Sequence, residues 1–147
     1  MKRIICLSVA LLPLLFCSHA QKPALNHIAL YVNSLQKSTA FYKDVVGLDT
    51  VPEPFHDGKH TWLAVGDKAN LHLIAGASGI TEHDKNSHLC FSVASVDAFI
   101  PRLNKAAIAY EDWPGKPQSI TLRVDGVKQI YFKDPDGYWI EINDARQ

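Results

Sequence analysis

The sequence has few cysteines and no excess of charge of either sign. It contains three cysteines, and its 15 basic residues balance 15 acidic ones. Cys6 and Cys17 lie in an N-terminal segment that we expect to be removed, so Cys90 alone remains and cannot form an internal disulfide. The same removal takes Lys2 and Arg3 and leaves a net charge of about −2. This charge does not favour a nucleic acid or another polyanion as a partner.

The N-terminal segment also lacks an apolar run long enough to span a membrane. Two basic residues precede an apolar stretch at residues 4–16, and small residues follow it. This pattern is typical of a secretory signal peptide. The stretch contains Pro13 and is shorter than the roughly 20 residues that a bilayer span needs. We therefore expect a signal peptide at residues 1–20, no stable membrane anchor, and an exported protein that is periplasmic or secreted.

The rest of the chain contains an internal repeat. Residues 86–96 are similar to residues 25–35, and both copies carry a histidine within an apolar run. A second apolar run follows each copy and holds one further residue of a type that binds metals. Such self-similarity indicates two related modules in one domain at residues 24–145. It places four potential metal ligands at matching positions: His27, His72, His88 and Glu141.

The first module, residues 24–76, begins with an alternating strand in which His27 lies on the face opposite that of Leu30. Ser34 is a favourable N-cap for the helix that follows, and Gly47 is suited to end it. After Gly47 the apolar period changes to two, which is the period of a strand. Further strands are expected at residues 48–51, 60–65 and 70–75, so the order is βαβββ.

A polar linker, residues 77–85, leads to the second module, residues 86–145. This module begins with a strand at residues 87–93 and a helix capped by Ser95. Pro101 falls within that helix and predicts a kink or a new start there. Strands are expected at residues 108–112, 120–124, 127–133 and 138–143. The last three repeat the βαβββ order of the first module, the strand at 108–112 is additional, and the fold class is α+β.

The repeat strengthens the case for a metal site. A single histidine or glutamate in a strand is more often a structural residue than a ligand. If the modules are related by a pseudo-two-fold axis, however, their four ligand-type side chains would meet at one centre. Three imidazoles and one carboxylate suit a divalent ion such as Zn, Ni, Fe, Mn or Co.

The segments around these residues resemble the vicinal oxygen chelate superfamily. The likeness rests on Leu-Asn-His-Ile-Ala-Leu around His27, Ser-His-Leu-Cys-Phe-Ser around His88, and Tyr-Phe-Lys-Asp-Pro-Asp-Gly-Tyr-Trp-Ile-Glu ending at Glu141. That group includes glyoxalase I, bleomycin and fosfomycin resistance proteins, methylmalonyl-CoA epimerase and extradiol dioxygenases. The resemblance implies two βαβββ modules in an incompletely closed eight-stranded barrel-like sheet around a divalent metal, with ligands at His27, His72, His88 and Glu141.

The resemblance favours a metal-dependent isomerase or lyase of the glyoxalase type. Its small-molecule substrate would chelate the metal through vicinal oxygens. His72 stands where glyoxalase I members typically carry Glu, so Glu141 is the expected catalytic base as well as a ligand.

Three alternatives stay open. An Fe(II) extradiol-type dioxygenase would need an acid near the metal, and only Tyr31, Tyr131 or Tyr138 could serve. A fosfomycin-resistance-like protein would be expected to carry Thr where this chain has Ala29, and an Arg beyond the final Glu, where only Arg146 is available. A metal-free binding protein, as in bleomycin resistance, would generally lack the ligand set.

The remaining candidates have simpler interpretations. Cys90 shares the face of His88 by strand alternation, but we expect a buried, apolar-like thiol. Solvated positions are expected for His56, His60, His83, Arg123 and Lys128.

We also expect a homodimer, because a βαβββ sheet has open edges that need to be covered. The site could lie within one chain or be shared between two chains.

Overall fold

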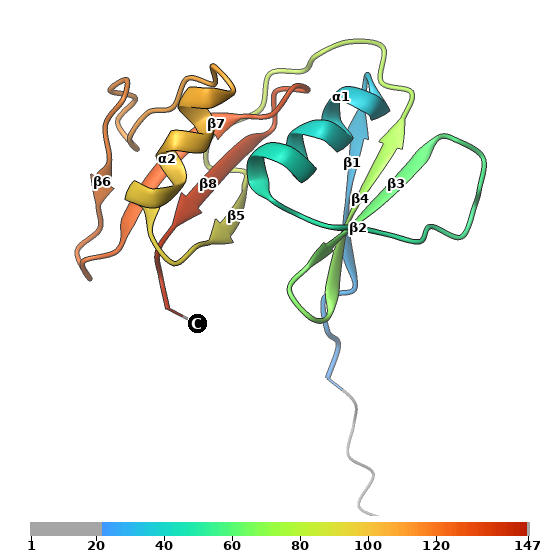
Figure 1. The fold of residues 1–147 in the computed structure, drawn as a ribbon, viewed down its shortest axis with the longest axis horizontal. Coiled ribbons are helices and arrows are strands. Elements are labelled where there is room, and N and C mark those ends of the chain that lie inside the picture. Colours follow the sequence, from blue (N-terminus) through green and yellow to red (C-terminus); the bar gives the residue numbers. More distant parts are fainter. Residues whose placement is uncertain (1–21, 147) are drawn as a thin grey trace, which may run out of the picture.

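The computed structural model describes residues 22–146, so the predicted signal peptide lies outside the described residues. Two four-stranded sheets, each with its own helix, form an α+β fold (Figure 1). The first module contains β1 (His27–Val32), α1 (Leu35–Ala40), the π-helical segment η1 (Phe41–Val46), β2 (Thr50–Val51), β3 (His60–Val65) and β4 (Ala69–Ala75). The second contains β5 (His88–Ser92), α2 (Val96–Lys105), β6 (Thr121–Leu122), β7 (Lys128–Lys133) and β8 (Trp139–Asn143). None of the helices within residues 22–146 has the length and apolar character that a membrane span requires.

The helix boundaries agree with the capping residues. The Ser34 side chain accepts a hydrogen bond from the Lys37 backbone N–H, and the Ser95 side chain accepts one from the Ala98 N–H. Gly47 ends η1 with a φ of 94°, a left-handed conformation that glycine adopts without a Cβ clash. The widening of the helix into η1 was not predicted from the sequence.

Two predictions for the second module differ from the structure. Of the kink or new start predicted at Pro101, the new start is wrong, because α2 runs through this residue as one element. Pro101 removes only one backbone donor, and the buried side chains of Val96, Phe99 and Leu103 hold the helix in place. The strand expected at residues 108–112 is absent, and Glu111 instead forms only isolated bridges to Pro117 and Tyr131.

The two sheets have the same strand order, which confirms the repeat in three dimensions. The orders are β1-β4-β3-β2 and β5-β8-β7-β6, with β1 parallel to β4 and β5 parallel to β8. Within residues 22–146, no strand of one sheet pairs with a strand of the other. The eight strands are therefore not closed into one sheet, and β1 and β5 are both edge strands.

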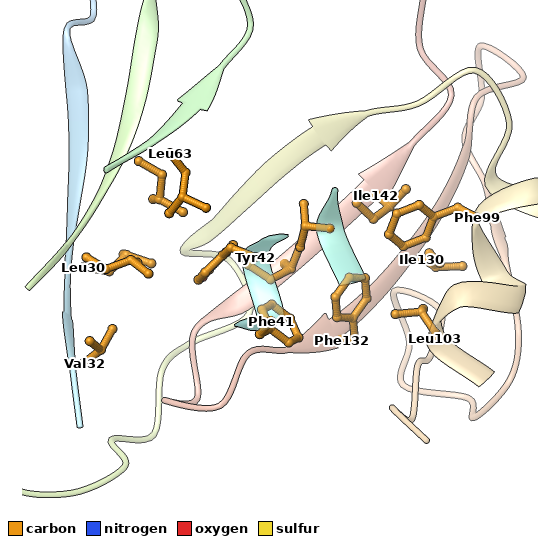
Figure 2. Packing of buried hydrophobic residues seen from close by; sticks show 14 of the residues in the cluster. Leu30, Val32, Phe41, Tyr42, Leu63, Phe99, Leu103, Ile130, Phe132 and Ile142 are labelled. Atoms are coloured by element: carbon orange, nitrogen blue, oxygen red, sulfur yellow. The ribbon is translucent and has the colours of Figure 1, made fainter. Parts of the chain in front are cut away.

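One hydrophobic core joins the helix-bearing sides of the two modules (Figure 2). Leu30 and Val32 of β1 belong to it, and the Phe41 ring of η1 lies 6.2 Å from the Phe132 ring of β7, centroid to centroid. Because side chains alternate along a strand, His27 lies on the face of β1 opposite Leu30 and Val32. The same alternation on β8 separates Glu141 from the buried Ile140 and Ile142.

A buried polar cluster also joins the modules, at the turn between β7 and β8. Tyr42 of η1 donates a hydrogen bond from its hydroxyl to Asp134 Oδ2 over 2.7 Å. Asp136 accepts hydrogen bonds from the Ser38 hydroxyl (2.5 Å) and the Asn33 backbone N–H (2.6 Å). Burial raises the pKa of Asp134, and the hydrogen bond from Tyr42 opposes that shift. The cluster and the core together attach α1 and η1 of the first module to the sheet of the second.

Candidate metal centre

The first pair of candidate ligands, His27 and His72, lies on one face of the first sheet. Residue 72 is paired in register with Ala29, and the two imidazole rings are 5.7 Å apart between centroids. His27 is exposed, whereas His72 is only 6% exposed. The Nδ1 atom of His27 is 2.8 Å from the Asn26 side-chain oxygen, which can only accept. Nδ1 therefore carries the proton in the neutral ring, and Nε2 keeps a free lone pair.

His60 belongs to the same face, so the prediction that it is solvated is wrong. Its Nδ1 is 2.8 Å from His72 Nε2, and the Trp62 ring stacks on His72 at 4.5 Å. Burial, His60 and His27 lower the pKa of His72, and Glu53 opposes them. The register of β3 with β4 places Trp62 opposite His72 and His60 two residues away on the same face.

The second pair, His88 and Glu141, makes direct contact on the second sheet. His88 Nε2 is 3.1 Å from Glu141 Oε2, and His88 Nδ1 is 2.7 Å from the Lys85 carbonyl oxygen. A carbonyl can only accept, so His88 Nδ1 carries a proton, and in the corresponding neutral tautomer Nε2 keeps the lone pair that a metal would bind. Two ligands about 2.1 Å from a shared ion lie about 3.0–3.4 Å apart at angles of about 90–109°. This pair therefore fits two ligands of one divalent cation.

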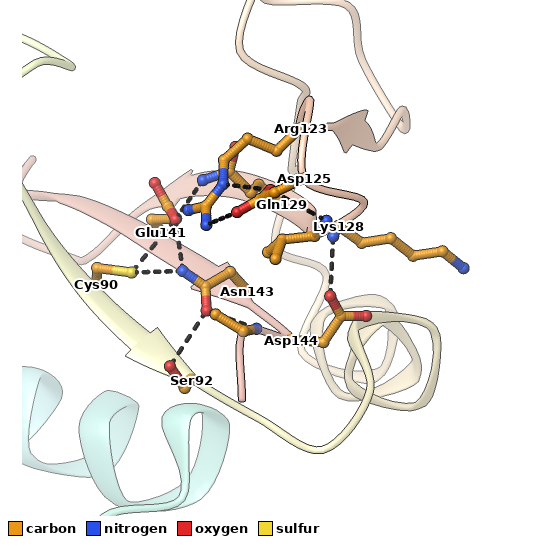
Figure 3. A network of polar contacts seen from close by, with 11 residues as sticks. Cys90, Ser92, Arg123, Asp125, Lys128, Gln129, Glu141, Asn143 and Asp144 are labelled. Carbon is orange, nitrogen blue, oxygen red and sulfur yellow. Dashed lines mark hydrogen bonds and ion pairs between the residues drawn. The ribbon is translucent and has the colours of Figure 1, made fainter. Parts of the chain in front are cut away.

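The Glu141 carboxylate is surrounded by hydrogen-bond donors (Figure 3). Gln129, Asn143 and Cys90 donate to Oε1 over 2.6, 2.8 and 3.3 Å, and the Tyr131 hydroxyl donates to Oε2 over 2.8 Å. Burial raises the pKa of Glu141, but these four hydrogen bonds more than offset it and hold the pKa below its usual value. Glu141 is therefore ionised at neutral pH, and Oε2 is the oxygen directed toward His88.

Cys90 is an exposed residue whose thiol lies at this site, so the prediction of a buried, apolar-like thiol is wrong. Its sulfur also accepts a hydrogen bond from Asn143 over 3.0 Å. Desolvation of the sulfur, together with the hydrogen bond to Glu141 and the charge of that residue, raises the pKa of Cys90 to about 12. Cys90 therefore remains a protonated thiol that donates to the carboxylate.

The other candidate residues lie as follows. Of the three tyrosines considered as acids, Tyr131 contacts Glu141, whereas the Tyr138 hydroxyl donates to the Tyr31 carbonyl oxygen. His56 is solvated as predicted, but His83 is not, because its ring stacks on Tyr138 at 4.0 Å. The exposed charges of the hairpin pair with neighbours, Arg123 with Asp125 and Lys128 with Asp97.

The structure brings the four candidate residues together two by two, His27 near His72 on one sheet and His88 near Glu141 on the other. Within residues 22–146, no group of three or more His, Cys, Asp or Glu side chains is placed to hold a metal ion. The first pair offers the free Nε2 of His27, and the second offers His88 Nε2 and Glu141 Oε2. A complete set of the predicted kind therefore requires the two ligand-bearing faces to meet.

Replacing Tyr131 by Phe is expected to raise the pKa of Glu141 in the metal-free protein, because it removes the donor to Oε2. A carboxylate whose pKa is lowered by folding adds stability above its unfolded pKa, and that stability is lost as pH falls through the folded pKa. The variant should therefore lose more stability at pH 7 than at pH 3. A carbon-13 NMR titration of the Glu141 carboxyl group measures the shift directly. An unchanged Glu141 pKa would show that the Tyr131 hydrogen bond does not hold the charge.

Comparison with known proteins gives a consistent set of relatives. A family model described as the Glyoxalase/Bleomycin resistance protein/Dioxygenase superfamily matches residues 24–142. The chain is 29% identical over 126 residues to metallothiol transferase FosB of Staphylococcus epidermidis, covering 82% of this chain and 80% of that protein. It is 26% identical over 126 residues to glyoxylase I 4 of Arabidopsis thaliana, covering 81% and 69% of the two chains. Among solved structures, oxidase ChaP-H2 is similar with a TM-score of 0.71 and 25% identity, covering 86% of this chain and 96% of that one.

Proposed function

Because the chain belongs to the Glyoxalase/Bleomycin resistance protein/Dioxygenase superfamily, we propose that it is a divalent-metal-dependent isomerase or lyase of the glyoxalase type. Relatives named as a transferase and a glyoxylase support an enzyme in general. The observation that carries the metal proposal is the contact between His88 Nε2 and Glu141 Oε2 at 3.1 Å. A neutral imidazole whose Nδ1 is occupied and an ionised carboxylate would repel each other at this distance unless a cation or a proton lay between them.

We propose further that the site is shared between two chains of a homodimer. The hydrophobic core and the buried polar cluster around Asp136 attach the two modules of one chain through their helix-bearing sides. The ligand pairs lie on the opposite faces of the two sheets. Among residues 22–146 the outer edges of β1 and β5 have no partner strand, so they offer backbone groups for pairing with a second copy. His27 and His72 of one chain would then join His88 and Glu141 of the other, and a two-fold dimer would contain two such sites.

The ligand chemistry sets the role of each residue. A bound divalent ion would supply Lewis-acid polarisation of adjacent substrate oxygens. Glu141 would accept a proton from the hydroxyl-bearing carbon of the substrate and return it to the neighbouring carbonyl carbon, while the hydroxyl proton passes to the adjacent oxygen, so the substrate is isomerised without a net change in protons. With its lowered pKa, Glu141 is a weak base, which suits only a proton already acidified by a polarised carbonyl. Gln129, Asn143 and Cys90 keep Oε1 fixed during this transfer.

An Fe(II) dioxygenase is the second candidate, and the position of Tyr131 favours it. The Tyr131 hydroxyl is 2.8 Å from Glu141 Oε2, and its ring lies 5.7 Å from that of His88, centroid to centroid. An acid beside the metal ligands is what ring cleavage would require. The two candidates differ in their metal and in their need for oxygen.

Elemental analysis of protein purified without chelators, combined with light scattering, tests the proposal. We expect one divalent ion per chain and a dimer of about 28 kDa, twice the mass of the chain without residues 1–20. Assays of candidate substrates with and without oxygen then separate the two reaction classes. A monomer with bound metal would contradict the shared site. A dimer that binds none of the five metals would contradict the metal-dependent enzyme.

A further inference from the structure

We propose that Lys85 is a positioning residue that fixes the imidazole of His88 and links it to Tyr131 and Glu141. Lys85 belongs to the linker between the modules and is not one of the candidate ligands. The effect on metal binding rests on the proposed function above, whereas the effect on the His88 ring does not.

The backbone of Lys85 determines which His88 nitrogen can bind a metal. Its carbonyl oxygen accepts the hydrogen bond from His88 Nδ1 over 2.7 Å. This bond leaves Nε2 as the free nitrogen and aims it at Glu141. In metal sites, partners of this kind orient the ligand ring and set its tautomer. Lys85 precedes β5, so strand pairing does not hold its carbonyl in position.

Contacts of the Lys85 side chain hold the Lys85 backbone in position instead. Its ammonium lies 5.8, 5.2 and 4.8 Å from the ring centroids of Trp113, Tyr131 and Trp139. It also donates to the carbonyl oxygens of residues 112 and 113 over 3.0 and 3.1 Å and forms an ion pair with Glu111. The side chain is only 16% exposed, which is rare for a lysine unless it is paired. Three aromatic faces, two carbonyls and a carboxylate therefore hold one charge, and they come from distant parts of the second module.

The groups around the Lys85 ammonium form a cage, made by the rings of Trp113, Tyr131 and Trp139 with Glu111 and two carbonyl oxygens. Tyr131 connects this cage to Glu141. Its ring forms one wall around the Lys85 ammonium, and its hydroxyl donates to Glu141 Oε2. Trp139, another wall, donates a hydrogen bond from its indole N–H to the His83 carbonyl oxygen over 3.0 Å and so fixes the linker at a second point. The caged ammonium thus fixes the linker that carries the His88 acceptor and packs against the ring that holds Glu141.

The chain offers a matched control in Lys133. Its ammonium lies 5.0 Å from the Trp139 ring and pairs with Glu82, so it has the same cation–π partner and an acidic neighbour. Lys133 is more exposed, at 36%, and the described hydrogen bonds link its side chain only to Glu82. Replacing it by methionine removes the same charge and one contact to the linker, at Glu82, but leaves the contacts of Lys85 in place.

The test compares Lys85→Met with Lys133→Met in the full mature protein. Nitrogen-15 NMR of the metal-free protein reports the protonated nitrogen of His88, and competition with a chromophoric chelator gives the affinity for Zn(II). We expect Lys85→Met to populate both His88 tautomers and to weaken Zn(II) binding about 10- to 100-fold. Lys133→Met should match the wild-type protein in both measurements. Lys85→Arg, which keeps the charge, should restore most of the affinity.

Two outcomes would overturn the role of Lys85. One is a His88 ring with the wild-type tautomer in Lys85→Met, and the other is an equal loss of Zn(II) affinity in Lys133→Met. If the wild-type protein binds none of the five metals, the proposed metal site fails, and the NMR comparison still decides whether Lys85 positions His88. Should Lys85→Met fail to fold, Glu111→Gln removes the ion-pair partner and leaves the aromatic cage, and it should give a smaller change in the same direction.

Discussion

Replacing His88 by alanine is expected to lower the bound metal from one ion per chain to none while the domain stays folded. The substitution removes Nε2, the nitrogen 3.1 Å from Glu141 Oε2. The His88 side chain is 22% exposed and lies outside the hydrophobic core, so its loss should leave the fold intact. Elemental analysis after dialysis measures the metal, and circular dichroism checks the fold. Unchanged metal content in this variant would refute the assignment of the site.

The other ligands are expected to rank in a defined order. His27→Ala and Glu141→Gln should also abolish stoichiometric binding, because His27, His88 and Glu141 form a two-histidine, one-carboxylate set. His72→Ala should have a milder effect, because the Nε2 atom of His72 is already engaged by His60 at 2.8 Å. A His72 variant that loses metal as completely as His88→Ala would show that His60 gives way and that His72 is a full ligand.

Replacing Asp136 by alanine should cause the largest loss of stability among polar substitutions, about 3 kcal/mol. Asp136 is only 4% exposed, and its removal leaves the Asn33 backbone N–H without its acceptor and the Ser38 hydroxyl without its shorter hydrogen bond. It also breaks the polar cluster that attaches the first module to the second. Urea unfolding should show a lower midpoint with an unchanged slope.

Asp136→Asn is the control for this substitution. It keeps a side-chain oxygen for the Asn33 N–H, and the Ser38 hydroxyl can still donate to the Ser34 carbonyl oxygen over 3.1 Å. We therefore expect less than half the loss seen in the alanine variant. Equal losses in both variants would show that the charge of Asp136, rather than its hydrogen bonds, holds the modules together.

The sequence predicts the architecture well where local rules decide it. Capping by Ser34 and Ser95 and the left-handed Gly47 mark the helix ends, and the strand at His60–Val65 has the predicted bounds. The prediction of a strand fails in the loop at residues 106–120, where Glu111 forms isolated bridges to Pro117 and Tyr131 instead of a continuous strand ladder. Such bridges depend on contacts with β7, which sequence periodicity does not reveal.

The candidate site shows the same division between local and long-range information. Strand alternation correctly places Cys90 on the face of His88, but whether that face is covered depends on the pairing of the sheets. The role of His60 requires the register of β3 against β4, which the strand pattern alone does not specify. The cage around Lys85 gathers residues 85, 111, 113, 131 and 139, so no local motif marks it. Export stays a prediction based on residues 1–20.

The shared metal site is tested most directly with a heterodimer of two defective chains. Chains carrying His27→Ala and Glu141→Gln are given different tags, coexpressed and isolated as the mixed dimer. If each site combines the first module of one chain with the second module of the other, one of the two sites in this dimer has all its native ligands. We predict one bound divalent ion per mixed dimer and none in either parent homodimer. A mixed dimer that binds no metal, alongside a wild-type dimer that binds one ion per chain, would contradict the shared site and place all four ligands within one chain.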